Sequence, residues 1–230
     1  EDVAYLAKEL IKIDSHDSAT IYYSSNNMVE EVKKGPLYEP KFIFYKTKFW
    51  KTIDKKSREV FDYFVKSFKK NIEVHDTPSY FDDIHKYHKI IYETDLANNF
   101  SDYYKNYKKK LSKIMQSAIS NGNKHSAKEY AEAIDFMKRS YDSYREVFED
   151  YHGVLSPSSP GVAPKGLKST GSADFNRVWS YLGNPCISLP LLQGENNLPL
   201  GIQVTGEKYD DNRFLAVSSW LEKESEKFNE

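Results

Sequence analysis

The 230-residue sequence contains one cysteine, Cys186, so the chain cannot form an internal disulfide. A lone thiol is typical of a reducing compartment, and we expect a cytoplasmic location. No apolar run approaches the roughly 18 residues that a membrane-spanning helix requires. The start, Glu1-Asp2-Val3, has neither the basic region nor the apolar core of a secretory signal. The sequence therefore predicts no membrane partner.

An excess of charge of either sign is also missing, because 33 basic residues stand against 34 acidic ones and the net charge is −1. Phosphate binding needs a concentrated basic field, so this balance argues against nucleic acid as a partner. Hydrophobic residues make up 39% of the chain and aromatic residues 15%, which is enough for a core under a polar surface. We expect a single domain over residues 1–230, since neither an internal repeat nor a disordered linker interrupts the sequence.

The first part of the chain, residues 1–152, is mainly helical in pattern. A helical stripe begins at once and consists of Val3, Leu6, Ala7, Leu10 and Ile11. A chain that begins inside a packed helix is expected to belong to something longer. Residues 54–70 predict a helix between two short strands, at 41–46 and at 72–74.

Three further helices are expected before residue 153. The first begins at Ser79 and carries Phe81, Ile84, His88 and Ile91 on one face. One apolar stripe runs from Phe100 to Ile114 as a single helical stretch. Ser126 and Glu129 form a capping box that starts the next helix, whose stripe continues to Tyr151.

The last part, residues 153–230, alternates short apolar runs with glycine and proline. Gly153 is expected to end the preceding helix, and a strand follows at 154–156. A short helix at 175–182 leads to two strands, 186–192 and 198–205, that form a hairpin. Asp210 and Asp211 are expected to cap a last helix. The fold class predicted is α/β, a mixed β-sheet covered by helices.

Seven strings in this last part occur in a recognisable order and resemble the C-terminal half of the amidase signature family. They are LSPSSP (155–160), AP (163–164), STG (169–171), FNRVW (175–179), LGNP (182–185), SLP (188–190) and LPLGIQ (198–203). Each string is weak alone, but together they cover some fifty residues. The strings FNRVW and LGNP resemble the sequences of free-standing amidases more than that of the corresponding component of glutamyl-tRNA amidotransferase.

The resemblance implies hydrolysis of carbon–nitrogen amide bonds by a serine nucleophile, a second serine in a cis peptide and a lysine base. These residues lie in a glycine/serine-rich stretch and upstream of it in the family, and this sequence has no such string. The resemblance therefore implies that they precede Glu1, that no residue here is catalytic, and that this chain alone is inactive. No cofactor and no metal are implied. The expected partners are a small carboxamide substrate, the missing N-terminal half and, as an open point, a second copy in a homodimer.

The resemblance also implies which residues line the substrate pocket. These substrate-binding candidates are Thr170, Gly171, Phe175, Asn176 and Trp179, in the loop–helix corner that the family brings over its nucleophile. Aromatic walls with a few polar groups suit an amide pocket. Phe175 and Trp179 are four residues apart on one helix, so a role in the core stays open for both.

For two other groups of residues we prefer a structural interpretation to a functional one. Asp82, His85 and His88 lie on nearly one helical face, but no second ligand cluster completes a metal site. Cys186, at the start of an apolar strand, is expected to be a small buried hydrophobe.

Two alternative functions remain open. The chain could be part of a tRNA-dependent amidotransferase, in which case a tRNA or a glutaminase partner would co-purify with it. It could also be a non-catalytic scaffold or binding fragment.

Overall fold

The structure is a computed structural model that describes residues 1–17, 20–22 and 27–227. The chain divides into two compact units. Unit 1 comprises Glu1–Thr77, Arg145–Trp179 and Gly183–Glu230, and unit 2 comprises Pro78–Tyr144 and Ser180–Leu182. No helix within the described ranges is long and apolar enough to cross a membrane. The single-domain expectation stays a prediction.

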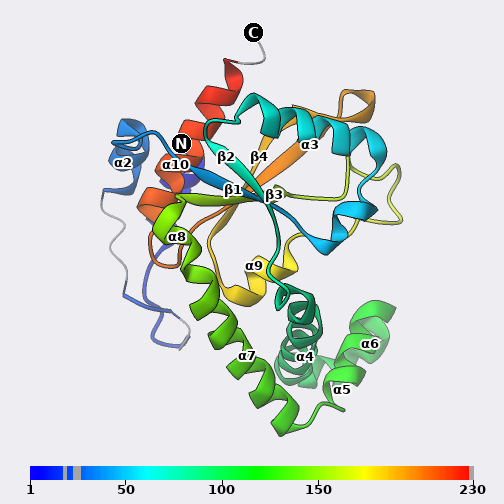
Figure 1. The fold of residues 1–230 in the computed structure, drawn as a ribbon. Coiled ribbons are helices and arrows are strands. Elements are labelled where there is room, and N and C mark those ends of the chain that lie inside the picture. The colour runs from blue at the N-terminus through cyan, green and yellow to red at the C-terminus, as the bar shows by residue number, and fades with distance from the viewer. Residues whose placement is uncertain (18–19, 23–26, 228–230) are drawn as a thin grey trace. The chain divides into compact units, whose positions relative to one another are not determined.

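Unit 1 contains a five-stranded mixed sheet. Its strands are β1 (Phe42–Lys46), β2 (Ile72–Asp76), β3 (Gly153–Pro157), β4 (Cys186–Gln193) and β5 (Pro199–Thr205). The spatial order is β2-β1-β3-β5-β4 (Figure 1). β1 runs parallel to both β2 and β3, and β5 runs antiparallel to β3 and β4. The α/β fold class is therefore confirmed, and each strand predicted from the sequence is present.

The helices of unit 1 surround this sheet. They are α1 (Asp2–Leu10), α2 (Met28–Lys34), η1 (Lys48–Thr52), α3 (Lys55–Ser67), α8 (Val147–Asp150), α9 (Arg177–Leu182, whose last turn belongs to unit 2), η3 (Glu195–Asn197) and α10 (Asp211–Glu226). α3 begins as predicted, because the carboxylate of Asp54 accepts a hydrogen bond of 2.8 Å from the backbone N–H of Ser57.

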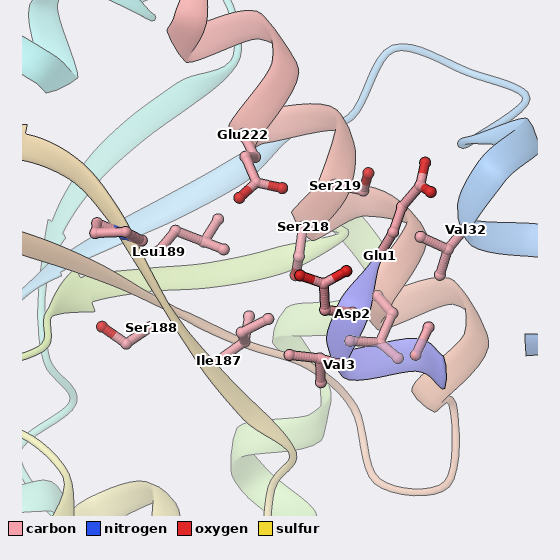
Figure 2. Close-up of a pocket in the computed structure, with 13 residues that line it drawn as sticks. Glu1, Asp2, Val3, Val32, Ile187, Ser188, Leu189, Ser218, Ser219 and Glu222 are labelled. Atoms are coloured by element: carbon pink, nitrogen blue, oxygen red, sulfur yellow. The ribbon is translucent and has the colours of Figure 1, made fainter. Parts of the chain in front are cut away.

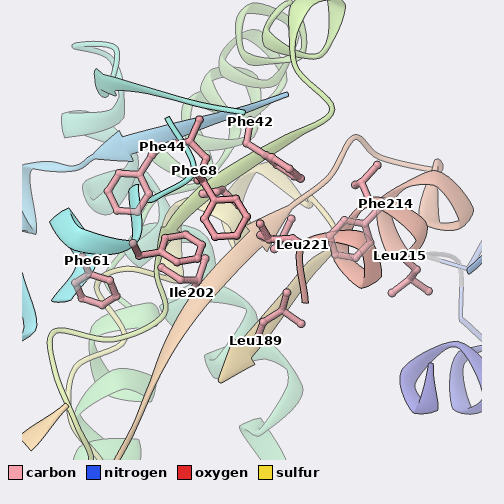
Figure 3. Close-up of a cluster of buried hydrophobic side chains, with 14 of the residues drawn as sticks. Phe42, Phe44, Phe61, Phe68, Leu189, Ile202, Phe214, Leu215 and Leu221 are labelled. Carbon is pink, nitrogen blue, oxygen red and sulfur yellow. The ribbon is translucent and has the colours of Figure 1, made fainter. Parts of the chain in front are cut away.

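One face of the sheet carries the main apolar core (Figure 3). Phe42 and Phe44 of β1 pack there with Phe61 of α3, and all three side chains are fully buried. Ile202 of β5 and Leu221 of α10 complete the same cluster. Because strand side chains alternate between faces, this packing places Ser156, Ser188 and Gln203, together with Val154, on the opposite face of β3, β4 and β5.

Three details of unit 1 correct the sequence predictions. Gly153 does not end the long helix but opens β3, since α8 and a short loop come between them. Asp210 precedes α10 without a side-chain cap, because its carboxylate binds Arg213 Nε at 2.7 Å instead. The predicted stripe on α1 is packed only in part, since Ala7 and Ile11 lie against the core whereas Leu6 and Leu10 are 62% and 70% exposed. The helix α2 was not predicted.

Unit 2 is helical. Its elements are α4 (Phe81–Asn99), α5 (Ser101–Tyr107), η2 (Lys108–Lys110), α6 (Lys113–Gly122) and most of α7 (Ala127–Arg145). The single helix expected between Phe100 and Ile114 is wrong. Three consecutive lysines repel one another in η2, and the hydroxyl of Ser112 then accepts a hydrogen bond from Met115 N–H at 3.2 Å to start α6.

The capping box at the start of α7 is confirmed. Glu129 accepts hydrogen bonds of 2.8 Å from both the N–H and the hydroxyl of Ser126, and the Glu129 N–H donates to that hydroxyl at 3.2 Å. Further along the predicted stripe Tyr144 is buried, whereas Tyr130 is half-buried and donates its hydroxyl to Asp95 at 2.9 Å. The stripe is therefore half-buried over most of its length and fully buried at Tyr144 and Phe148. Phe148 belongs to α8, because α7 ends at Arg145.

Candidate functional site

A row of polar side chains crosses three neighbouring strands of unit 1. Ser156 of β3 lies opposite Gln203 of β5, and Gln203 lies opposite Ser188 of β4. Residues that face one another across strands project to the same side of a sheet, so these three side chains share one face. We call them, together with Ser158, the serine–glutamine row.

The exposed end of the row is a pair of hydroxyl groups. Ser158 Oγ and Ser188 Oγ are 2.7 Å apart, and Ser158 N–H donates to the carbonyl of Gly201 at 3.1 Å. A Cβ at position 201 would lie 2.6 Å from Ser188 Oγ and 2.7 Å from Ser158 Oγ. Gly201 therefore leaves the space in which the two hydroxyls meet.

The inner end of the row is buried and incompletely hydrogen-bonded. Ser156 and Gln203 are 1% and 5% exposed. In the described part of the chain, Ser156 Oγ and Gln203 Oε1 have no hydrogen-bond partner. Such groups usually cost stability, because water has been removed and nothing replaces its hydrogen bond.

Replacing Ser156 by alanine should therefore leave the chain equally stable or stabilise it by up to about 1 kcal/mol, because an unpaired hydroxyl is removed. Ser218→Ala is the matched control, since Ser218 is 1% exposed and its hydroxyl donates to Phe214 O at 2.7 Å. The control should not stabilise the chain. Urea unfolding measures both variants, and a loss of 1 kcal/mol or more, as an order of magnitude, in Ser156→Ala would contradict the unpaired hydroxyl.

Cys186 lies on the same face and corrects a prediction. It is exposed rather than buried, because β4 is an outermost strand of the sheet. Its sulfur is 3.5 Å from the hydroxyl of Thr205. Desolvation nevertheless raises the pKa of the Cys186 thiol, and hydrogen bonds with Thr205 and Gln203 oppose this only in part. The thiol is therefore protonated at neutral pH and is a poor nucleophile.

The row lacks the groups that would activate a serine. A serine hydroxyl becomes a nucleophile when a lysine, histidine or carboxylate takes its proton. The hydroxyls of Ser158 and Ser188 bond to each other, and that of Ser156 to no described group. Lys165 and Lys168 are exposed on the following loop, and no contact joins either of them to these serines. The row can donate and accept hydrogen bonds, but it contains no acid–base pair.

The five predicted substrate-binding residues fall into two groups. Thr170 and Gly171 are exposed on the loop after β3, where Gly171 has a φ of +87° and its N–H donates to Ser169 Oγ at 3.1 Å. Asn176 is half-buried, and its N–H donates to Ala173 O at 3.0 Å. A pocket role for these three residues stays a prediction.

The two aromatic candidates are buried. Phe175 is 2% exposed and meets Phe49 of η1 edge-on, with ring centroids 6.2 Å apart. Trp179 of α9 is 1% exposed. Neither ring is open to solvent in this structure, so the reading of both as core residues is the one that burial favours.

A cavity of about 180 Å³ lies among α1, α2, β4 and α10 and borders one end of the serine–glutamine row (Figure 2). Glu1, Asp2 and Glu222 bring carboxylates to it, and Ser218 and Ser219 of α10 bring hydroxyls. Ser188 of the serine–glutamine row also lines the cavity, and apolar side chains such as that of Leu189 form the rest of the lining. The cavity has no pairing of a nucleophile with a base. Within the described residues, no group of three or more histidine, cysteine, aspartate or glutamate side chains could hold a metal ion, including the His85 and His88 pair.

Comparison with known proteins extends these observations. The sequence model of the Amidase family matches residues 1–215. A glutamyl-tRNA(Gln) amidotransferase component from Alkaliphilus metalliredigens is 32% identical over 108 residues, which are 44% of this chain and 22% of that protein. Fatty-acid amide hydrolase 2 of Homo sapiens is 42% identical over 106 residues, which are 40% of this chain and 20% of that protein.

A solved structure agrees with the fold. A bacterial aryl acylamidase of the amidase signature family superposes with a TM-score of 0.73 at 13% identity, over 96% of this chain and 50% of that chain. This chain therefore spans about a fifth of each curated relative and half of the solved structure.

Proposed function

This chain belongs to the amidase family, and from that premise we propose that it forms the C-terminal part of a hydrolase that cleaves linear amide bonds. The single observation that carries this proposal is the family match, which extends over residues 1–215. The α/β sheet and its superposition on half of an amidase signature enzyme support it.

The proposed mechanism places the nucleophile on a segment outside this chain. An upstream serine, a bridging serine and a lysine would form the acyl-enzyme, and an oxyanion hole of backbone N–H groups would stabilise it. The serine–glutamine row supports this division, because its hydroxyl groups have no base. In this proposal the loop after β3 forms one wall of the pocket.

Two exposed surfaces suit an upstream partner segment. Val3, Leu6 and Leu10 of α1 are 49%, 62% and 70% exposed and lie on one side of the helix. β4 is an outermost strand, so one row of its backbone N–H and C=O groups is open to further pairing. Exposed apolar side chains and unpaired strand edges favour aggregation. A partner segment that covered the α1 side chains and the β4 edge would remove this tendency. A homodimer would be the alternative way to cover them.

The loop residues Thr170, Gly171 and Asn176 are proposed to touch the substrate, while Phe175 and Trp179 would support the wall from behind. In a chain joined to its upstream half, Asn176→Ala should lower kcat/KM by about 10- to 100-fold, the cost of one lost hydrogen bond to a polar substrate. Amine or ammonia release from a panel of amides measures this.

The matched control is Lys168→Ala, an exposed change on the same loop that should leave kcat/KM within about twofold. An unchanged kcat/KM for Asn176→Ala across the panel would remove Asn176 from the pocket.

A second candidate function is that of a component of a tRNA-dependent amidotransferase. The observation in its favour is that several curated relatives are named as glutamyl-tRNA(Gln) amidotransferase components. Affinity purification from the source cells separates the two proposals. A co-purifying glutaminase or amidotransferase partner would favour the amidotransferase, whereas amide hydrolysis without such a partner would favour the free-standing amidase.

A further inference from the structure

The second unit carries a local concentration of positive charge that the balanced total conceals. Residues 105–113 read KNYKKKLSK and hold five lysines without an acidic residue. The whole chain, in contrast, has 33 basic and 34 acidic residues. Repelling charges packed this closely cost free energy unless an anionic partner is bound.

These lysines are free to meet such a partner. Lys105, Lys108, Lys109 and Lys110 are all exposed. In the described ranges, the ion pairs that lysines form with carboxylates involve residues elsewhere in the chain, such as Lys89 with Glu93, and none of these four. Asp102 is the one carboxylate on α5 itself.

Aromatic rings are interleaved with the lysines. Tyr103 and Tyr107 are 56% and 52% exposed, and their ring centroids are 6.4 Å apart on successive turns of α5. The ring of Phe100 adds a third aromatic group to this row, and its centroid is 5.9 Å from that of Tyr103. Lys110 Nζ lies 5.3 Å from the centroid of the Tyr107 ring. The Lys110 ammonium group thus lies beside the ring of Tyr107, while both tyrosine side chains stay about half exposed to solvent.

The segment formed by α5 and η2 also contains a groove. An open groove of about 540 Å³ is lined by Tyr103 and Tyr107, by Lys110 and Leu111, and by the polar side chains of Asp102 and Asn106. Its volume falls in the range, about 300 to 1,000 Å³, of sites for small organic groups such as a nucleobase. Asp102 and Asn106 offer an acceptor and an amide for the polar edge of such a group.

We propose that this lysine–tyrosine patch, formed by Tyr103, Tyr107, Lys105, Lys108, Lys109 and Lys110, binds a single-stranded nucleic acid. Bases stack on exposed aromatic rings whatever their sequence, and lysines follow the phosphate backbone. An anionic lipid surface would meet the lysines too, but Asp102 and Asn106 in the groove suit a base edge better than acyl chains. This inference is independent of amide hydrolysis, and it departs from the expectation drawn from net charge.

The test is fluorescence anisotropy of a labelled oligouridine of about 12 nucleotides titrated with the full 230-residue chain. Raising the salt from about 50 to about 200 mM should weaken binding with a logarithmic slope of about −2 to −3.5, for three to five phosphates neutralised. Lys108→Gln, Lys109→Gln and Lys110→Gln together should reduce that slope by about 2. Tyr103→Ala with Tyr107→Ala should weaken binding by at least about 25-fold, about fivefold for each ring.

Matched controls lie on α3 of unit 1. Lys55→Gln, Lys56→Gln and Lys66→Gln together remove the same charge, and Tyr63→Ala removes a tyrosine that is 71% exposed and so at least as accessible as Tyr103 and Tyr107. Both should leave binding within about twofold, and circular dichroism establishes that each variant is folded. An independent reading is ultraviolet cross-linking, which should attach uridine to the peptide that contains Tyr103 and Tyr107.

Competition experiments identify which kind of nucleic acid binds. Single-stranded DNA should compete with single-stranded RNA, since stacking does not need the 2′-hydroxyl, whereas duplex RNA should compete weakly. Equal binding to duplex and single strand would overturn the stacking role. Loss of binding in the α3 controls, or capture by vesicles of phosphatidylserine and phosphatidylcholine without binding of oligouridine, would overturn the proposal.

Discussion

The purified 230-residue chain should release no measurable ammonia or amine from any linear amide. Enzymes accelerate their reactions by about 10⁶-fold or more, so the expected loss relative to an intact amidase is at least of that size. No other prediction made for this chain involves so large a change in rate.

The reason lies in the hydroxyl groups of the serine–glutamine row. Ser158 and Ser188 bond to each other at 2.7 Å, and a second neutral hydroxyl cannot take the proton of the first. Ser156 is buried without a described partner, and desolvation keeps the neighbouring Cys186 protonated. Nothing in this row therefore generates an oxyanion or a thiolate at neutral pH.

The measurement is a panel of aliphatic and aryl amides followed by ammonia and amine detection. As a positive control, the chain is fused behind the upstream half of fatty-acid amide hydrolase 2, the relative with 42% identity over 106 residues. Activity in the fusion, lost when its upstream nucleophilic serine becomes alanine, is expected. Turnover by the 230-residue chain alone would show that the nucleophile lies within it.

Replacing Gly122 by alanine should strongly destabilise unit 2. An added Cβ would lie 1.9 Å from the backbone carbonyl oxygen of Glu93 and 2.8 Å from the Cβ of Ala97. Backbone of α4 cannot move aside as a flexible side chain would, so α4 and α6 must separate. We expect a loss of about 3 kcal/mol or more and a fall in Tm of roughly 6 to 12 °C.

The clash also reaches a buried carboxylate. Glu93 is 5% exposed and accepts from Asn121 Nδ2 at 3.1 Å, and its other oxygen lies 3.0 Å from His125 Nε2. Parting the helices would take Asn121 and His125 away from this charge and leave it only its longer pair with Lys89 of α4, at 3.9 Å, which adds to the cost.

Thermal and urea unfolding followed by far-ultraviolet circular dichroism measure the change in Gly122→Ala. Gly35→Ala is the control, because no atom lies within 4 Å of its added Cβ and only its φ of +71° is unfavourable. Because its ψ is 179°, Gly35 lies in a backbone region that is essentially restricted to glycine, so that control should cost about 1 to 3 kcal/mol. Equal losses in the two variants would contradict the close approach of α4 and α6.

The strands and most helices could be predicted because their signals are local. The run of aromatic and β-branched residues in β1 and the capping box of Ser126 and Glu129 depend on residues a few positions apart. The break between α5 and α6 was missed, since an apolar stripe continued through it while three adjacent lysines and the hydroxyl of Ser112 favoured a new helix. Periodicity alone does not weigh charge repulsion.

Burial was harder to predict than secondary structure. The sequence shows that Leu6, Leu10 and Cys186 are apolar or weakly polar, but not what lies against them. Because β4 is outermost and the side of α1 that carries Leu6 and Leu10 faces solvent, all three are exposed. Phe175 shows the reverse, since a predicted pocket residue lies in the core.

The serine–glutamine row could not be derived from spacing. Ser156 and Ser188 are brought together by the strand order β3-β5-β4 and by the register of Gln203 with both. Register between distant segments is a non-local property. The one local signal was that Ser158 and Ser188 both lie in proline-containing strings, SPSSP and SLP, of the kind found where strands end.

The central claim is that this chain supplies the wall of an amidase pocket and not its nucleophile. A fluorophosphonate, which forms a covalent adduct only with an activated serine, tests it most directly by intact-protein mass spectrometry. We predict no adduct on the 230-residue chain and one adduct on the upstream serine of the fusion. An adduct on Ser156, Ser158 or Ser188 of the chain alone would contradict the claim.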